Sequence, residues 1–207
     1  MSNLRFEEAG HRYVEDEVEI PTLSRVLELS GLRPDDSRVP LEVLMFAQRR
    51  GKAVHKAIAL HLEDSLDWDS VGEDVYPQVR AALDYLEREE RKLIEWETPR
   101  GGGEVGFACT PDLVVEDGVV EWKTTSAIYP EVAIQLMGQV VALDAARPQD
   151  GTRLLFDKNG HRKFDHERRV VHLKKDGTYK IKDFVDHDGD HRVMEAALRI
   201  AQWRLDQ

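Results

Sequence analysis

An Asp-Gly pair between two valine-rich runs constrains the fold of this chain more than any other feature. Residues 109–125 read Cys-Thr-Pro-Asp-Leu-Val-Val-Glu-Asp-Gly-Val-Val-Glu-Trp-Lys-Thr-Thr. Asp-Gly between apolar runs is a strong β-hairpin signal, because tight hairpin turns need the positive φ angles that glycine adopts easily. With Asp117-Gly118 as the turn, the pattern predicts a definite register. It sets Glu116 opposite Val119, Val114 opposite Glu121, and Asp112 opposite Lys123.

The two faces of this hairpin differ in chemistry. Side chains alternate between the faces of a strand, so Leu113, Val115, Val120 and Trp122 share one apolar face that belongs in a core. The other face carries Asp112, Glu121 and Lys123 beside Val114. Diagonal neighbours lie about 7–8 Å apart, so a cation could sit between the two carboxylates. A solvated outer face with an Asp112–Lys123 ion pair explains the same spacing, and the spacing alone does not decide between these interpretations.

Pro111-Asp112, followed by Glu121-Trp122-Lys123, resembles the PD-(D/E)XK nuclease signature. Asp112 matches its aspartate, Glu121 and Lys123 match its E-x-K, and Thr124-Thr125 resemble the threonines that often follow. Upstream, residues 50–55 are similar to the R-G-x-x-x-H helix motif of the RecB-type and phage exonuclease branch. Downstream, Gln135 and Gln139 stand where that branch carries Q-x-x-x-Y, with Gln139 in place of the tyrosine. Cys109 replaces a glycine often found before the aspartate.

The resemblance implies an α/β (α+β) fold with a restriction-endonuclease-like core, in which helices flank a central mixed sheet. It places a single nuclease domain over residues 1–207, with the core at about 41–157. The N-terminal extension, 1–40, would hold a β-meander, and residues 165–207 a hairpin and a helix. The implied activity is that of a Mg²⁺- or Mn²⁺-dependent deoxyribonuclease, with an exonuclease favoured, acting in recombination, repair or phage DNA processing.

The resemblance also assigns roles to individual residues. Lys123 would orient or deprotonate the attacking water and counter the charge of the phosphate. Oxygen ligands suit Mg²⁺, and a histidine ligand is compatible with Mn²⁺. Glu95 or Glu97 is either an accessory ligand or a rim carboxylate. The implied metal ligands are His55, Asp112, Glu121 and the backbone carbonyl of Trp122; the catalytic residues are Asp112, Glu121, Lys123 and Gln135; the DNA contacts are Arg50, Lys52, Thr124, Thr125 and Gln135.

Composition limits the other classes of protein. The 207 residues, 41% of them hydrophobic, suffice for one domain, and no apolar run reaches the length of a membrane span. The N-terminus lacks the pattern of a secretory signal, and the single Cys109 excludes an internal disulfide and a four-cysteine iron–sulfur cluster. These features predict a cytoplasmic protein.

The charge balance opposes a nucleic-acid partner. The chain has 40 acidic and 29 basic residues, a formal net charge of −11, whereas nucleic-acid binders are typically basic. Binding requires only a local positive patch beside the site. Candidates for it are Arg49, Arg50, Lys52, Lys56, Arg162, Lys163, Arg168, Arg169, Lys174 and Lys175.

Periodicity and turn residues predict the remaining elements. Helices are expected at 23–29, 41–62, 75–94, about 129–146 and 192–205. Strands are expected within 4–20, at 104–108 as the first strand of the central sheet, at 152–156, and as a hairpin of 168–173 with 178–184. Asp190 is expected to cap the last helix, whose predicted core face holds Val193, Ala197, Ile200 and Trp203.

Three functions stay open. The favoured one is a metal-dependent nuclease whose partner is DNA, either at ends or in single-stranded segments, with a recombination partner protein and a homo-oligomer both compatible with it. The second is a DNA-binding module that keeps the fold without the activity. The third is a metal hydrolase of small phosphate esters, which the acidic charge would suit.

Overall fold

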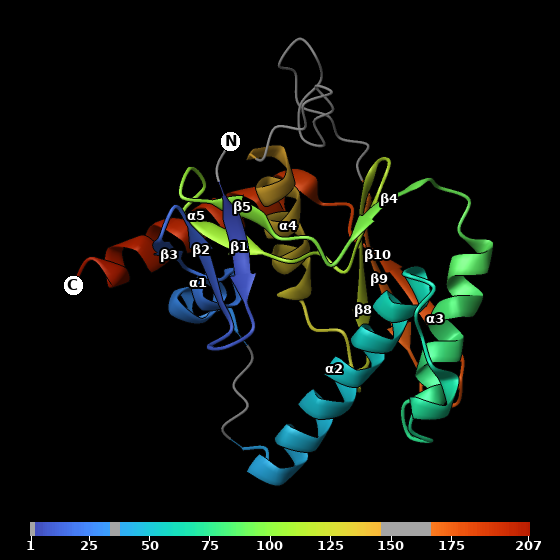
Figure 1. The fold of residues 1–207 in the computed structure, drawn as a ribbon. Coiled ribbons are helices and arrows are strands. Elements are labelled where there is room, and N and C mark those ends of the chain that lie inside the picture. Colours follow the sequence, from blue (N-terminus) through green and yellow to red (C-terminus); the bar gives the residue numbers. More distant parts are fainter. Residues whose placement is uncertain (1–2, 34–37, 146–166) are drawn as a thin grey trace.

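A five-stranded mixed sheet forms the centre of the molecule (Figure 1). The computed structural model describes residues 3–33, 38–145 and 167–207. The strand order is β10-β9-β8-β7-β4, and β8 and β9 run parallel while the other neighbours are antiparallel. This confirms the predicted α/β class with a central mixed sheet. The strands are β4 (Leu93–Trp96), β7 (Leu113–Val115), β8 (Gly118–Lys123), β9 (Glu167–Leu173) and β10 (Tyr179–Asp183).

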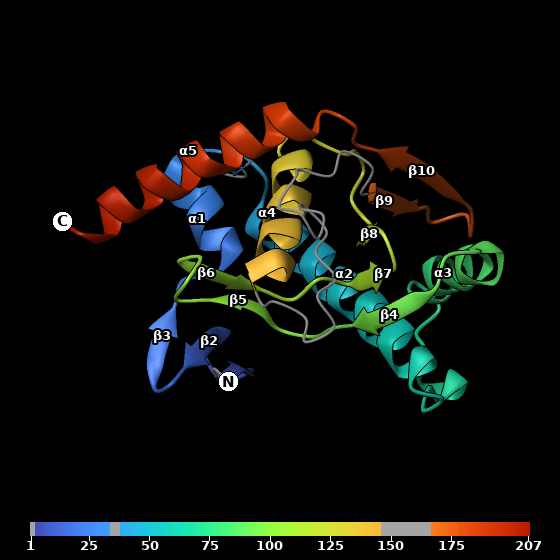
Figure 2. The ribbon, with the colours of Figure 1, turned by 90° about the horizontal axis from the view of Figure 1, so that it is seen from above.

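Helices cover both faces of this sheet (Figure 2). One layer contains α1 (Leu23–Ser30), α4 (Val132–Ala145) and α5 (His187–Leu205), which share a core with Val114 and Val119. The other contains α2 (Leu41–Leu62) and α3 (Tyr76–Arg88), which pack against Leu113 and Trp122. The apolar face of the 109–125 segment therefore packs in a core, as predicted, and its charged face turns toward the other helix layer.

Two small sheets complete the architecture. The predicted N-terminal meander is present as β1 (Leu4–Glu7), β2 (Arg12–Glu15) and β3 (Val18–Ile20). β5 (Arg100–Gly102) and β6 (Phe107–Cys109) form a separate pair. The expectation that residues 104–108 begin the central sheet is therefore wrong. β4 takes the edge position instead, because the positive φ angles of Gly101 and Gly102 turn the chain away from the sheet after that strand.

The predicted hairpin register is wrong by two residues. Val115 pairs with Gly118, so the turn consists of Glu116 and Asp117 rather than of Asp117 and Gly118. Gly118 serves another purpose, because a Cβ there would overlap the backbone of Glu167 in the parallel neighbour β9. A shift of two preserves the faces, since side chains alternate with a period of two. If the observed pairing is extended by one residue beyond Leu113 and Val120, Asp112 lies opposite Glu121 rather than opposite Lys123.

The helix predictions hold best at the N-terminal end of the chain. α1 ends at the left-handed Gly31 and α2 spans 41–62, both as expected. α3 stops at Arg88 instead of 94, because Leu93 and Ile94 belong to the edge strand β4. α4 begins at Val132, and the predicted C-terminal hairpin is present as β9 and β10.

α5 begins earlier than predicted, and a different face of the helix is buried. Asp186 caps it, accepting a hydrogen bond of 2.9 Å from the backbone N–H of Gly189. Asp190 lies within the helix and binds the fully buried Arg168 at 2.8 Å. This ion pair turns another face of α5 inward, so the predicted core face is wrong except at Ala197. The buried residues are Met194, Ala197 and Ala201, whereas Val193, Ile200 and Trp203 are exposed.

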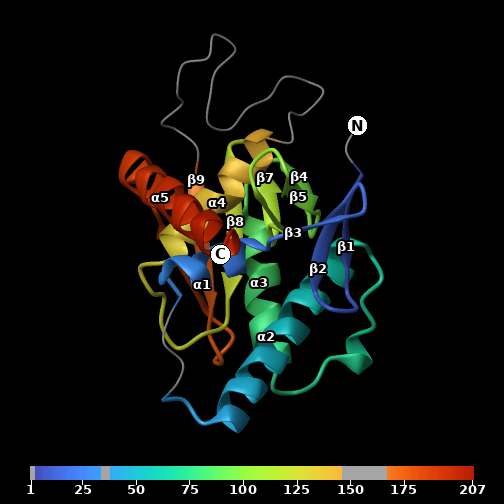
Figure 3. The ribbon, with the colours of Figure 1, turned by 90° about the vertical axis from the view of Figure 1, so that its left-hand side faces the viewer.

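The first half of α2 projects from the body of the molecule (Figures 1 and 3). Only Val54, Ala57 and Ile58 are buried, and Val43 and Phe46 are about half exposed. In the same half, Leu44 is partly buried and Ala47 is exposed.

Within the described ranges, no helix combines the length and the apolar character needed to cross a membrane. The predicted strand at 152–156, and the basic residues Arg162 and Lys163, lie outside the described residues.

The close approach at Gly118 yields a stability prediction. We expect Gly118→Ala to lower the free energy of unfolding by about 2–3 kcal/mol, because the added methyl group forces β8 away from β9. Urea denaturation followed by circular dichroism measures this change. Glu116→Ala in the adjacent exposed turn is the control, with an expected effect within about 0.5 kcal/mol. Equal stabilities of the two variants would contradict the parallel pairing described here.

Candidate functional site

Asp112 connects helix α2 to strand β8. Its carboxylate is buried and accepts two hydrogen bonds, one from His55 Nδ1 at 2.9 Å and one from the backbone N–H of Trp122 at 2.8 Å. Burial and the nearby charge of Glu121 raise the pKa of Asp112. Burial opposes the charged form of His55, yet the carboxylate of Asp112 raises the pKa of His55 to about 9. The imidazole and the carboxylate therefore form a pair at the end of β7.

Glu121 is held from two sides. Lys123 Nζ donates to Glu121 Oε1 at 2.7 Å and to Gln135 Oε1 at 2.9 Å. Gln135 Nε2 donates to the same Glu121 oxygen, and Gln139 Nε2 donates to the other, both at 2.7 Å. Burial alone would raise the pKa of Glu121, but the charge and hydrogen bond of Lys123 lower it. Glu121 in turn raises the pKa of Lys123 against the effect of burial.

Local geometry explains why these four side chains meet. Glu121 and Lys123 are two residues apart and so share one face of β8. Gln135 and Gln139 are one helical turn apart and share the face of α4 that packs on this strand. The prediction that the charged face of the hairpin gathers Asp112, Glu121 and Lys123 is met, with Glu121 rather than Lys123 beside Asp112.

Glu97 lies beside His55 and Asp112 as a third candidate metal ligand. The sequence alone did not decide between Glu95 and Glu97 for this role. His55, Glu97 and Asp112 each offer a ligand atom, and these atoms lie within 4.8 Å of one another. Glu97 adopts a left-handed backbone with φ of 44°, a strained conformation for a non-glycine residue. Burial of its carboxyl group and the charge of Asp112 raise the pKa of Glu97 to about 7. Glu95 instead forms an ion pair with Arg100.

The donor set fits a hard divalent cation. Carboxylate oxygens with one imidazole suit Mg²⁺ or Mn²⁺. The carboxyl groups of Asp112 and Glu97 repel each other, which contributes to their raised pKa values, and a bound cation would offset that repulsion. Glu121 faces Lys123 and the two glutamines and is not one of the three residues grouped within 4.8 Å. The carbonyl of Trp122 as a ligand stays a prediction.

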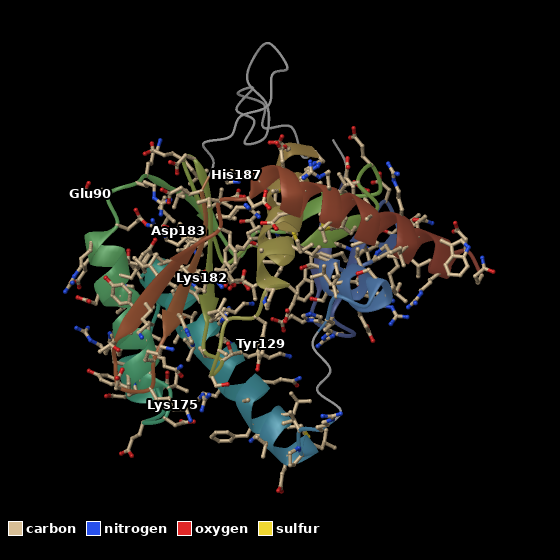
Figure 4. All side chains as sticks on the ribbon, turned by 180° about the vertical axis from the view of Figure 1, so that it is seen from behind. Glu90, Tyr129, Lys175, Lys182, Asp183 and His187 are labelled. Atoms are coloured by element: carbon tan, nitrogen blue, oxygen red, sulfur yellow. The ribbon has the colours of Figure 1, made fainter. Side chains whose placement is uncertain are left out.

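The site opens into a cavity of about 860 Å³ between α1, the first half of α2, the segment after β8, and the β9–β10 turn. Figure 4 labels Tyr129 and Lys175, which line it. His55, Lys123 and Gln135 form the part of the wall next to the carboxylates. Glu131 is the one acidic residue among the described lining residues. The basic lining residues are Arg33, Arg50, Lys123, Lys174 and Lys175.

The predicted DNA contacts lie mostly on this cavity. Arg50, Thr124, Thr125 and Gln135 line it, whereas Lys52 is exposed on α2 and does not. Gly51 faces Thr124, whose Oγ1 would lie 3.3 Å from an added Cβ. A glycine at position 51 thus lets α2 approach the segment after β8 closely, which gives the Arg-Gly pair a physical reason.

Two of the basic residues proposed to contact DNA form ion pairs away from the cavity. Arg168 is buried against Asp190, and Arg169 forms an ion pair with Asp183 at 2.7 Å. Neither lines the cavity.

No model of a known protein family matches the chain, and no curated protein matches its sequence. Among solved structures, the chain is similar to LHK-Exo, an alkaline exonuclease from Laribacter hongkongensis, with 15% identity and a TM-score of 0.41 over 89% of this chain and 87% of that one. A complex of LHK-Exo with dAMP is similar at 14% identity and a TM-score of 0.42, over 90% and 88%. These likenesses are low, so the functional argument rests on the geometry of the site.

Glu97 provides a test of the metal site. We expect Glu97→Gln to weaken Mn²⁺ binding at least about tenfold, because the variant loses one negative ligand beside Asp112. Isothermal titration calorimetry with Mn²⁺ measures the affinity. The matched control is Glu95→Gln, which removes the same charge two residues away, where the side chain binds Arg100. A larger loss of affinity in Glu95→Gln would refute the assignment of Glu97.

Proposed function

We propose that this protein is a metal-dependent nuclease of the PD-(D/E)XK type that hydrolyses phosphodiester bonds in DNA. One observation supports the proposal above the others. Asp112, Glu121 and Lys123 converge at one end of β7 and β8, and Lys123 reaches the wall of a cavity whose described lining has five basic residues and one acidic residue. A cation-lined cavity in a chain of net charge −11 fits a polyanionic substrate that meets a metal site.

The side chains divide the work of the reaction. A divalent ion would be held by Asp112, Glu121, His55 and the Trp122 carbonyl, with Glu97 as a further ligand. When bound, it would neutralise charge on the phosphate and lower the pKa of a water molecule. His55 orients Asp112 through their 2.9 Å hydrogen bond. The raised pKa of Lys123 keeps its amine protonated beside Glu121, so it acts on the phosphate as a positive charge and hydrogen-bond donor rather than as a base.

Finer aspects of the function belong to the same proposal. The Arg50–His55 motif on α2 and Gln135 on α4 both reach the site, which supports the RecB-type and phage exonuclease branch. We infer a single nuclease domain over residues 1–207 and an exonuclease that acts on DNA ends or single-stranded segments. Recombination, repair or phage DNA processing in the cytoplasm, with a partner protein or as a homo-oligomer, is consistent with this role.

A metal hydrolase of small phosphate esters is the second candidate. The cavity volume of about 860 Å³ lies within the usual range of small-molecule sites, about 300–1,000 Å³. A DNA-binding module without activity is less well supported, because Glu121 and Lys123 are in contact and Asp112 is bound to the backbone of Trp122 between them.

Lys123 separates the three functions. Wild-type protein should degrade linear DNA in Mg²⁺ or Mn²⁺, and Lys123→Ala should lower the rate by about 10²–10⁴-fold while keeping the metal affinity. Gel assays on linear and circular DNA, together with p-nitrophenyl phosphate hydrolysis, measure these activities. Lys182→Ala, an exposed change on β10, is the control. Hydrolysis of the small ester without any cleavage of DNA would favour the second candidate, and binding without cleavage the inactive module.

Asp112 tests the ligand assignment. We expect Asp112→Ala to lose both Mn²⁺ binding and DNA cleavage, because the variant removes the carboxylate shared by His55 and Trp122. Calorimetry and the gel assay are run on the same preparation, and a thermal melt verifies folding. Unchanged Mn²⁺ affinity in Asp112→Ala would show that the metal binds elsewhere.

A further inference from the structure

His172 and Lys174 form a second polar cluster beside the site. His172 is buried in β9, and its Nε2 lies 2.6 Å from the carbonyl oxygen of Thr125. Since a carbonyl only accepts, Nε2 carries a hydrogen and donates it. The segment that follows the catalytic strand is therefore tied to β9 through this ring. Lys123 and His172 are direct neighbours in the parallel register of β8 and β9.

The ammonium of Lys174 packs over the ring of His172. Its Nζ lies 2.9 Å from Nδ1 and 3.1 Å from Nε2, and two nearly equal distances place it over the imidazole rather than in line with one nitrogen. Nδ1, the ring nitrogen that does not face the Thr125 carbonyl, is the nearer of the two to the ammonium. The ring thus holds the amine of a partly buried lysine that lines the cavity.

The position of Lys174 relative to Lys123 suggests its role. Lys174 follows His172 by two residues, which corresponds to about 7 Å along an extended chain. Adjacent phosphates of one extended nucleic-acid strand are separated by a similar step. A strand with one phosphate at Lys123 can therefore bring its neighbouring phosphate to Lys174. The exposed Lys175 continues the same wall at the β9–β10 turn (Figure 4).

The cavity offers complementary groups to such a strand. Arg50, on α2, lines it, and its buried Nε has no hydrogen-bond partner among the described residues. The apolar lining from α1 and α2 offers contacts for sugars and bases. It includes Leu27, Leu32, Val39, Val43 and Leu44.

We propose that Lys174, held over His172, binds the phosphate adjacent to the one being cleaved, and so forms a second phosphate subsite of the cavity. This inference rests on the proposed nuclease function. It assigns a substrate contact to the β9–β10 turn and a positioning role to His172, which touches Thr125 and Lys174 rather than the substrate.

The experiment measures DNA binding apart from cleavage. Fluorescence anisotropy with a labelled single-stranded oligonucleotide, in EDTA so that the strand stays intact, gives the affinity over a range of salt concentrations. We expect Lys174→Gln to weaken binding severalfold and to reduce the slope of log K against log salt by about 0.7, the value for one lost contact to a single strand. Lys174→Arg should keep the slope, since it keeps the charge.

Lys182→Gln is the matched control. It removes the same charge from the neighbouring strand β10, at a position that does not line the cavity (Figure 4), so its slope should equal that of the wild type. His172→Gln should weaken binding less than Lys174→Gln, and the effects should not add in the double variant, because both act through one amine. A purely structural role for His172 would shift the melting temperature without changing the slope.

The outcomes separate this inference from the proposed function. A wild-type slope in folded Lys174→Gln, or equal losses in Lys174→Gln and Lys182→Gln, would overturn the subsite even if DNA is cleaved. The absence of DNA binding by the wild type at low salt would overturn it as well. A reduced slope in Lys174→Gln without any cleavage by the wild type would retain the phosphate contact and refute the nuclease.

Discussion

The partly buried contact between Glu121 and Lys123 is the interaction on which the site depends. Removing such charges from water costs several kcal/mol per ion, and mutual attraction compensates only when the remaining hydrogen-bonding groups are satisfied. Both oxygens of Glu121 have donors, supplied by Lys123 and by two amides of α4. Since apolar residues of similar size would stabilise such a position equally well or better, this arrangement is explained by chemistry rather than by stability.

The distribution of charge matters more than its sum. A net charge of −11 opposes a nucleic-acid partner, yet among the residues that the structure describes, five basic and one acidic line the cavity. Composition could not show this, because the basic residues serve different purposes. Arg168 neutralises Asp190 in the interior, whereas Lys174 lies over His172 at the cavity. Which of them could meet a substrate depends on contacts between segments far apart in the chain.

Alternation along strands made the faces of the central hairpin predictable, and helical periodicity did the same for the second half of α2. The register of the hairpin was not predictable. Gly118 is needed because β8 packs closely against the backbone of Glu167, nearly fifty residues away, and it is not part of the turn. The predicted cap, Asp190, instead binds the buried Arg168, and Asp186 caps the helix. Glu97 lies near the other candidate ligands, His55 and Asp112, only because β4 is the edge strand beside β7.

Gln139 shows what the site requires at that position. The related motif carries a tyrosine there, whose hydroxyl could donate one hydrogen bond to Glu121. The amide of Gln139 supplies that donor at 2.7 Å, but its own buried oxygen has no partner in the described part of the chain. An unsatisfied buried acceptor costs about 1–3 kcal/mol. As a donor to Glu121, a glutamine therefore costs more folding free energy than a hydroxyl group. Gln139 at this position is explained if its hydrogen bond to the second oxygen of Glu121 outweighs that cost.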